Sequence, residues 1–126
     1  MRTLAIAAAA LLTLGACSGR PHHVTPQDRN LITADEIAKS NASNAYEAVE
    51  RLRPAFLRTR GSQSLQNQEP PTPMIYVDGM RYSPLQTLSS IPAIGIVSIQ
   101  YLSAIEATQR FGFGNEGGAI MITTKH

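Results

Sequence analysis

The sequence predicts a small α/β (α+β) domain, with a mixed β-sheet of about four strands and short helices. Apolar, β-branched runs at 74–77, 96–102 and 119–124 are typical of strands. The dipeptide Asp78-Gly79 indicates a tight turn into a short return strand, because both central residues of a type I′ turn need positive φ. Pairs of a capping residue and a glutamate three positions later predict the helix starts. The 126 residues leave room for one small domain.

The first helix is expected at residues 34–39. Thr33 and Glu36 form a capping box, in which each side chain satisfies an unpaired backbone N–H at the helix start. Asn41 is a suitable stop, because asparagine tolerates the left-handed conformation that ends many helices. Ile32 and Ile37 stand at the two positions of a hydrophobic staple at the start of this helix.

A second helix is expected from Asn44 to about Leu52. Glu47 stands three residues after Asn44, as in a further capping box. Pro54 disfavours helical geometry in the residue before it, so the helix should end near Leu52. Residues 58–73 carry almost no apolar side chains and are expected to form a mobile loop.

The segment after the predicted hairpin contains a short helical turn and a third helix. Pro84 is expected at the first helical position of the short turn, after a capping serine. Ser103 and Glu106 form another capping box and predict a helix at residues 104–110. Gly112 stands where a glycine commonly ends a helix.

A glycine-rich block between this helix and the last strand fits the pattern G-x-G-x-x-G. A dinucleotide-binding loop requires a strand before the glycines and a helix N-terminus after them, whereas here the order is helix, glycines, strand. A helix C-terminus carries partial negative charge and Glu116 adds a full one, which disfavours phosphate. Gly112, Gly117 and Gly118 are therefore interpreted as turn residues, and no nucleotide or other cofactor is expected.

Asp78 is the one carboxylate in a motif that invites a catalytic interpretation. No partner acid, histidine or metal-ligand pattern lies near it in the sequence, so a role in the turn with Gly79 is favoured. His22 and His23 form a weak metal motif because no further ligands have suitable spacing. No catalytic residue and no metal site are predicted.

Residues 1–16 have the features of a signal peptide. Arg2 precedes an apolar run that is shorter than the roughly 20 residues of a transmembrane helix. The run ends in Leu-Gly-Ala before Cys17, the only cysteine of the chain, and this L-G-A-C sequence resembles a bacterial lipobox. The resemblance implies cleavage before Cys17 and its acylation. The alternative is an ordinary secretory signal in which the cysteine is incidental.

Residues 17–30 are polar and are expected to tether the domain at 31–126 to the lipid. The formal net charge of +2 includes Arg2, and no nucleic-acid footprint is predicted. The arginines at 51, 53, 58 and 60 are close in sequence. They either contact acidic lipid or lipopolysaccharide, or they belong to a solvated helix end and loop, and the second interpretation is favoured.

Three blocks of the sequence resemble the plug domain of TonB-dependent outer-membrane receptors. They are residues 32–54, 74–82 and 97–125, and the last is the most specific, with Phe-Gly, Gly-Gly and Ile-x-Ile-Thr-Thr-Lys in the family's order. Val77-Asp78-Gly79 matches the family's central turn. The pair Gln100-Tyr101 departs from the Glu-Val that the family usually has in the late strand.

The resemblance implies a plug-like fold and an outer-membrane location, and residue Ser18 agrees with the latter because an aspartate after the lipidated cysteine favours the inner membrane. A receptor barrel of about 22 strands would need over ~200 further residues, so transport by this chain alone is not expected. The expected function is a non-catalytic binding or adaptor lipoprotein, accessory to outer-membrane transport. Its partner would be a barrel protein or an envelope glycan. The alternatives are a separately encoded plug of a barrel receptor, a decayed receptor fragment and a small envelope enzyme.

Overall fold

The structure is a computed structural model that describes residues 29–58, 71–82 and 84–126. The predicted signal peptide, Cys17, the histidine pair and most of the predicted loop at 58–73 lie outside the described residues. The elements in chain order are β1 (Leu31–Thr33), α2 (Ala34–Ser40), α3 (Ala45–Leu52), η1 (Pro54–Leu57), β2 (Met74–Val77), β3 (Met80–Tyr82), η2 (Leu85–Ser90), η3 (Ala93–Gly95), β4 (Ile96–Leu102), α4 (Ala104–Phe111) and β5 (Ala119–Thr124), where η marks a 3₁₀ helix.

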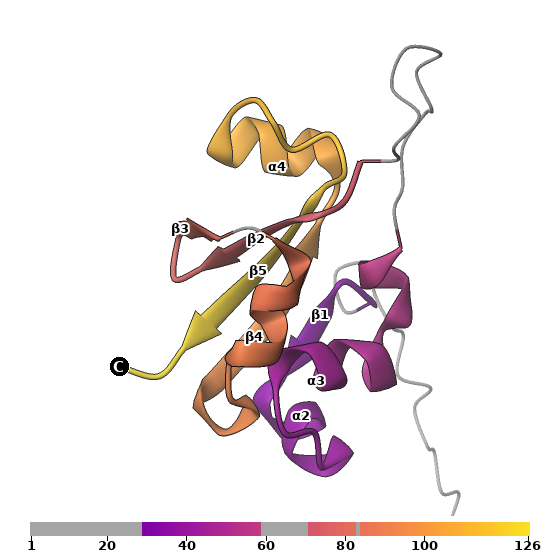
Figure 1. Cartoon of the computed structure of the whole chain (residues 1–126), viewed down its shortest axis with the longest axis vertical. Coiled ribbons are helices and arrows are strands. Elements are labelled where there is room, and N and C mark those ends of the chain that lie inside the picture. The colour runs from indigo at the N-terminus through magenta and orange to yellow at the C-terminus, as the bar shows by residue number, and fades with distance from the viewer. Residues whose placement is uncertain (1–28, 59–70, 83) are drawn as a thin grey trace, which may run out of the picture.

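The described residues form one mixed sheet with the strand order β1-β4-β5-β2-β3. Strands β2 and β5 run parallel, and the other neighbouring strands are antiparallel. Figure 1 shows β5 running through the middle of this sheet. The predicted α+β class is confirmed, and the sheet has five strands where about four were expected.

Strand β1 is the element that the prediction missed. Leu31–Thr33 pairs with β4, with Ile32 opposite Ile99, although no strand was expected before α2. Thr33 still caps α2, and both bonds of the predicted capping box are present. The short strand and the helix cap thus share one residue.

Helices α2 and α3 end where the sequence predicts. Asn41 has φ 52° and ends α2 in the left-handed conformation. The Asn44 side chain accepts a hydrogen bond of 2.9 Å from the backbone N–H of Glu47. The reciprocal bond differs from a capping box, because Glu47 accepts from the backbone N–H of Ser43, at 2.7 Å, and not from that of Asn44.

The predicted helical turn after the hairpin is the 3₁₀ helix η2. Pro84 has extended geometry and lies just before this helix, so its predicted place at the first helical position is wrong. Helix α4 has both bonds of its capping box, and Gly112 follows it with φ 86°.

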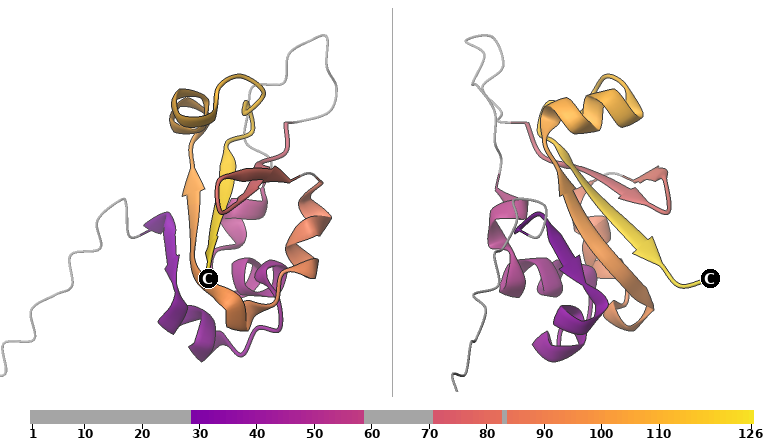
Figure 2. Two further views of the ribbon diagram at one scale, coloured as in Figure 1. Left: turned by 90° about the vertical axis from the view of Figure 1, so that its left-hand side faces the viewer. Right: turned by 180° about the vertical axis from the view of Figure 1, so that it is seen from behind.

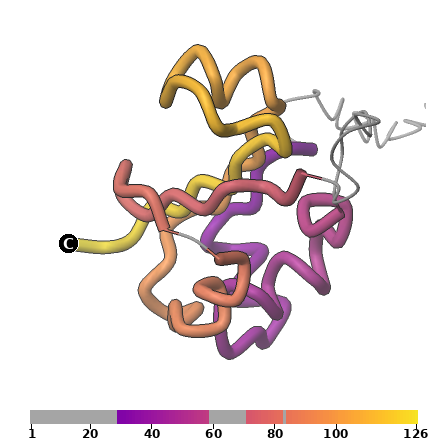
Figure 3. The backbone as a smooth tube through the Cα atoms, turned by 45° about the horizontal axis from the view of Figure 1, so that its top comes forward, coloured from indigo at the N-terminus to yellow at the C-terminus, as the bar shows by residue number. Residues whose placement is uncertain are grey.

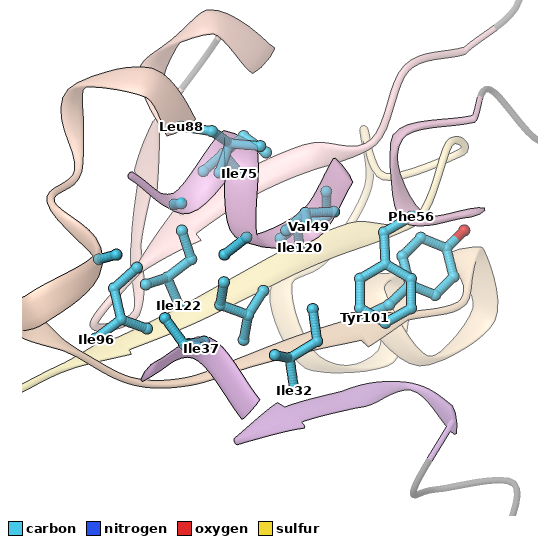
Figure 4. Packing of buried hydrophobic residues seen from close by; sticks show 14 residues of the cluster. Ile32, Ile37, Val49, Phe56, Ile75, Leu88, Ile96, Tyr101, Ile120 and Ile122 are labelled. Atoms are coloured by element: carbon cyan, nitrogen blue, oxygen red, sulfur yellow. The ribbon is translucent and has the colours of Figure 1, made fainter. Parts of the chain in front are cut away.

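One face of the sheet packs against α2, α3, η1 and η2. The buried residues of this main core are Ile32, Ile37, Ala45, Ala48, Val49, Phe56, Ile75, Leu88, Ala93, Ile96, Ile99, Tyr101, Ile120 and Ile122. Figure 4 shows these side chains meeting between the strands and the helices. Six of these seven isoleucines come from four of the five strands, and four of the six lie on β4 and β5.

The opposite face of the sheet is covered at one end by α4. Its smaller core contains the buried residues Tyr76, Leu102, Ala107 and Ala119, with Met74, Phe111 and Met121 packed against them. In the left panel of Figure 2, α4 lies above the upper ends of β4 and β5, whereas the helical turn of η2 lies to the right of the strands. We call α4 and the following residues 112–118 the α4 lobe.

Candidate functional site

The glycine-rich loop joins the C-terminal end of α4 to β5. The backbone N–H of Gly112 donates to Thr108 at 2.8 Å as the last contact of the helix, and the loop then runs back beside α4 (Figure 3). The order of elements is helix, loop, strand, as the sequence predicts. The loop therefore meets the carbonyl end of α4, where an anion is repelled and not attracted.

Gly117 and Gly118 lie where the loop passes closest to the rest of the molecule. A Cβ atom on Gly118, which has φ +82°, would lie 2.6 Å from the carbonyl oxygen of Leu102. A Cβ atom on Gly117 would come within contact distance of the backbone of Thr72, closer than any real Cβ contact. Both glycines are thus explained by the backbone packing of the loop.

Asn115 fixes the loop from within and is the one buried polar residue among those the structure describes. Its Oδ1 accepts a hydrogen bond of 3.0 Å from the Tyr76 hydroxyl, and its Nδ2 donates to the Gly112 carbonyl at 2.8 Å. The ring of Phe111 stacks on that of Tyr76, with centroids 3.8 Å apart. These contacts join the C-terminal end of α4 to strand β2.

Phe113 points away from this supported loop and is 92% exposed. It stands between Gly112 and Gly114, which both have positive φ. Of the two phenylalanines in Phe111-Gly112-Phe113-Gly114, Phe111 packs against the smaller core and Phe113 does not. A position between two glycines favours neither a helix nor a strand. This signal could have identified Phe113 as an exposed loop residue.

Other side chains extend this surface along α4 and onto the hairpin. Ile105 is 72% exposed and lies on an open, shallow surface with Thr108, Gln109 and Glu116. The guanidinium group of Arg81, on β3, lies next to Gly114. We call the exposed residues Ile105, Phe113 and Arg81 the lobe surface.

Asp78 connects the two sequence motifs that carry the family resemblance. Asp78 and Gly79 have φ values of 49° and 84°, which are the positive values of a tight hairpin turn. The Asp78 carboxylate accepts hydrogen bonds from the backbone N–H of Thr124, at 2.9 Å, and from its hydroxyl, at 2.6 Å. These hydrogen bonds hold the pKa of Asp78 below its ordinary value of 3.8. The carboxylate therefore links the hairpin to the end of β5.

The arginine cluster of the sequence is divided by the fold. Arg51 donates to the backbone carbonyls that end α2, at 2.8 Å from Ser40. Arg53 pairs with Glu36 at 3.0 Å. Arg58 is exposed, and residue 60 lies outside the described ranges. Arg51 and Arg53 therefore both have partners within the domain.

Within the described residues, no three histidine, cysteine, aspartate or glutamate side chains are grouped so that they could hold a metal ion. No helix in the same part of the chain is both long and apolar enough to span a bilayer.

No protein-family model and no curated protein matches the chain.

Proposed function

We propose that the protein is a non-catalytic lipoprotein of the outer membrane, in which a plug-like domain acts as a binding or adaptor module. Acylation of Cys17 in the L-G-A-C sequence would supply the anchor, and no cofactor takes part. The residues on which the family resemblance rests support this proposal, because they make backbone turns and strand contacts. Asp78 holds Thr124, and Gly118 packs against Leu102, so neither motif is left to bind a ligand.

The observation that carries the binding role is the exposure of Phe113 on a supported loop. An aromatic side chain that is 92% exposed gains little from folding, whereas its neighbours Phe111 and Asn115 are fixed by the inner contacts of the α4 lobe. Rigid aromatic side chains are favoured in protein interfaces because they bury a large area at small entropic cost. We propose the lobe surface as the contact with a protein partner in the envelope, with an outer-membrane barrel protein as the class of partner.

A separately encoded plug is the second candidate function. Further large apolar side chains are exposed on elements outside the α4 lobe, namely Ile94 on η3 (88%) and Met80 on β3 (60%). Apolar residues on several sides of a small domain would be covered if a barrel wall surrounded it.

Site-specific crosslinking in intact cells distinguishes the two. A photoreactive phenylalanine analogue at position 113 should give adducts with one barrel protein, identified by mass spectrometry. The same analogue at Glu50, an exposed position on α3, is the control and should give no such adduct. Equal barrel adducts from positions 50, 94 and 113 would instead support the enclosed plug. Adducts with glycan alone, or none above the control, would contradict a protein-binding lobe surface.

The anchor has its own test. Cys17→Ser should leave the protein unlipidated, so that it is either uncleaved or no longer bound to the membrane. Lipidation is measured by metabolic labelling with a fatty-acid analogue, and location by density-gradient fractionation. Mature, membrane-bound protein in this variant would refute the lipobox assignment, and inner-membrane fractions of the wild type would refute the location.

A further inference from the structure

The edge of the sheet at β3 lies next to the lobe surface. Strand β3 is last in the strand order and pairs only with β2, so its other side has no neighbouring strand among the described residues. All three of its side chains are exposed. Figure 1 shows β3 at the outer end of the sheet, away from α2 and α3. Such an edge is a template on which another chain can add a strand.

The backbone of Arg81 is the part of β3 that faces this open side. On β2, the backbone N–H groups of Met74 and Asp78 donate to β5, each at 2.9 Å. Backbone groups point to alternate sides along a strand, so Val77 faces β3, where its pairing partner is Met80. The same alternation on β3 turns the N–H and C=O groups of Arg81 away from β2. A partner strand can therefore bond to both groups.

The side chains of β3 lie on the two faces of the sheet. Arg81 is opposite Tyr76, which belongs to the smaller core, so Arg81 lies on the side of α4. Its guanidinium group lies next to Gly114. Met80 and Tyr82 lie on the other side and are 60% and 39% exposed. An added strand would cover both of them, since paired strands are only about 4.8 Å apart.

The charge of Arg81 decides what the added strand should carry. In the part of the chain that the structure describes, Arg81 takes part in no ion pair and donates no hydrogen bond. Opposite charges at facing positions of paired strands stabilise the pair, and like charges destabilise it. Two copies of β3 paired about Arg81 would place like charges opposite each other. The charge therefore disfavours pairing between copies and favours a partner with an acidic residue.

We infer that β3 binds an extended segment of the partner as a further antiparallel strand, with an acidic residue opposite Arg81 and an apolar residue on each side of it. The backbone of the acidic residue exchanges both hydrogen bonds with Arg81, and its carboxylate lies beside the guanidinium group. The two apolar side chains lie beside Met80 and Tyr82. This inference rests on the proposed function, because it names the form of the partner segment that meets the lobe surface.

The experiment uses the full chain, purified in a non-ionic detergent and followed by amide NMR during titration to millimolar peptide. The probes are capped pentapeptides, Thr-Val-Glu-Val-Thr and its counterpart with lysine at the centre. The glutamate peptide should bind in a saturable way and slow the solvent exchange of the Arg81 amide. The amides of Met80 and Tyr82 already bond to β2, so their exchange should change little. The lysine peptide should bind about fivefold more weakly.

N-methylation of the peptide tests the backbone hydrogen bonds directly. A methyl group on the nitrogen of the central glutamate removes the donor that faces Arg81 and should abolish binding. The matched control is a methyl group on the nitrogen of the following valine, which faces away from β3 in the added strand. It should change the affinity little. Equal effects of the two methyl groups would contradict strand pairing.

Two variants of the protein test the role of the charge. Arg81→Glu should reverse the preference, so that the lysine peptide binds more tightly than the glutamate peptide. Arg58→Glu makes the same change in net charge just after η1, which Figure 1 shows at the opposite side of the view from β3, and it should keep the preference. Both side chains are exposed, and far-UV circular dichroism verifies that both variants are folded. The same preference in the wild type and both variants would refute the role of Arg81.

Strand addition and the lobe contact fail in different ways. Crosslinks from position 113 to a barrel protein, without binding of either peptide, would refute strand addition and leave the lobe contact in place. Peptide binding at β3 without such crosslinks would support strand addition and contradict the barrel partner. Signals of β3 that broaden with protein concentration in the absence of peptide would show pairing between two copies and would overturn the inference.

Discussion

The two faces of the sheet are stabilised in different ways. The main face buries one continuous cluster of fourteen residues under α2, α3 and the 3₁₀ helices, with isoleucines at its centre. The face under α4 buries only four residues, and there a buried asparagine and a ring stack complete the packing. Stability on the first face is shared among many similar contacts, whereas on the second it depends on a few specific ones.

This difference explains where an interaction surface can be placed. The α4 lobe carries Phe113 and Ile105 in the exposed positions, and it is joined to the sheet by contacts that can be changed one at a time. The main face supports the sheet on which this lobe rests. The effects of substitutions on the two faces should therefore differ in size and in how far they spread through the domain. The following predictions go from the largest effect to the smallest.

Adjacent residues of β5 give the most direct test, because Ile120 faces the main core and Met121 faces the α4 lobe. Ile120→Ala should lower the free energy of unfolding by about 2–5 kcal/mol, the usual cost of truncating a fully buried isoleucine. Met121→Ala should cost about 1 kcal/mol, because Met121 is only partly buried. Urea denaturation measures both values. Equal costs would contradict the proposed difference between the faces.

Gly118→Val should destabilise the domain through the glycine-rich loop. A β-branched residue at φ +82° is strained by about 1–3 kcal/mol, and its Cβ would also approach the Leu102 carbonyl and the Tyr101 hydroxyl. Gly95→Ala is the control, because Gly95 has neither positive φ nor any atom within 4 Å of an added Cβ. It should leave the melting temperature unchanged or slightly raised. A normal melting temperature for Gly118→Val, with loss of nucleotide binding, would reverse the interpretation of the loop.

Asn115→Ala should loosen the α4 lobe and leave the main core intact. The substitution removes the partner of the buried Tyr76 hydroxyl, which costs about 1–3 kcal/mol. Hydrogen exchange should become faster at residues 112–118 and remain slow at Ile99 and Ile122. Tyr76→Phe in the same background removes the unpaired hydroxyl and should recover part of the loss. Faster exchange throughout both cores would show that the lobe is not a separate unit of stability.

Much of the fold could be predicted from short-range signals. The capping pairs, the Asp78-Gly79 turn and the glycine after α4 each depend on neighbours within four residues, and the elements they predict are present. Strand β1 could not be found in this way, because its three residues have no distinctive pattern and pair with β4 far along the chain. The tertiary pairing alone makes Leu31–Thr33 a strand.

The candidate sites were less predictable, for the same physical reason. Asn115 is buried because the Tyr76 hydroxyl, 39 residues away in sequence, faces it. The role of Asp78 in the turn followed from the dipeptide, but its contact with Thr124 did not, since that contact depends on the parallel pairing of β2 with β5.

The smallest expected effect concerns this contact, and it appears as a dependence on pH. A carboxyl group whose pKa is lowered on folding stabilises the native state fully above its unfolded pKa, here about 3.8, and loses this contribution as the pH falls through the folded value. Hydrogen bonds from Ser43 and Ser103 lower the pKa of Glu47 and Glu106 as well, so the wild type should lose stability in acid from several groups. The contribution of Asp78 to this loss can therefore be isolated only by comparing the wild type with a variant at this residue.

Asp78→Asn is the suitable variant, because asparagine tolerates the positive φ of this turn and keeps one oxygen to accept from Thr124. It should reduce stability slightly at neutral pH and make the loss of stability below about pH 4 less steep than in the wild type. Thr124→Val removes the hydroxyl donor and should act in the same direction. The double variant should lose less stability than the sum of the two single losses, because both substitutions remove the same interaction. Thermal unfolding between about pH 2 and pH 7 measures all four proteins. An identical pH dependence in wild type and Asp78→Asn would show that this carboxylate does not link the hairpin to β5 in solution.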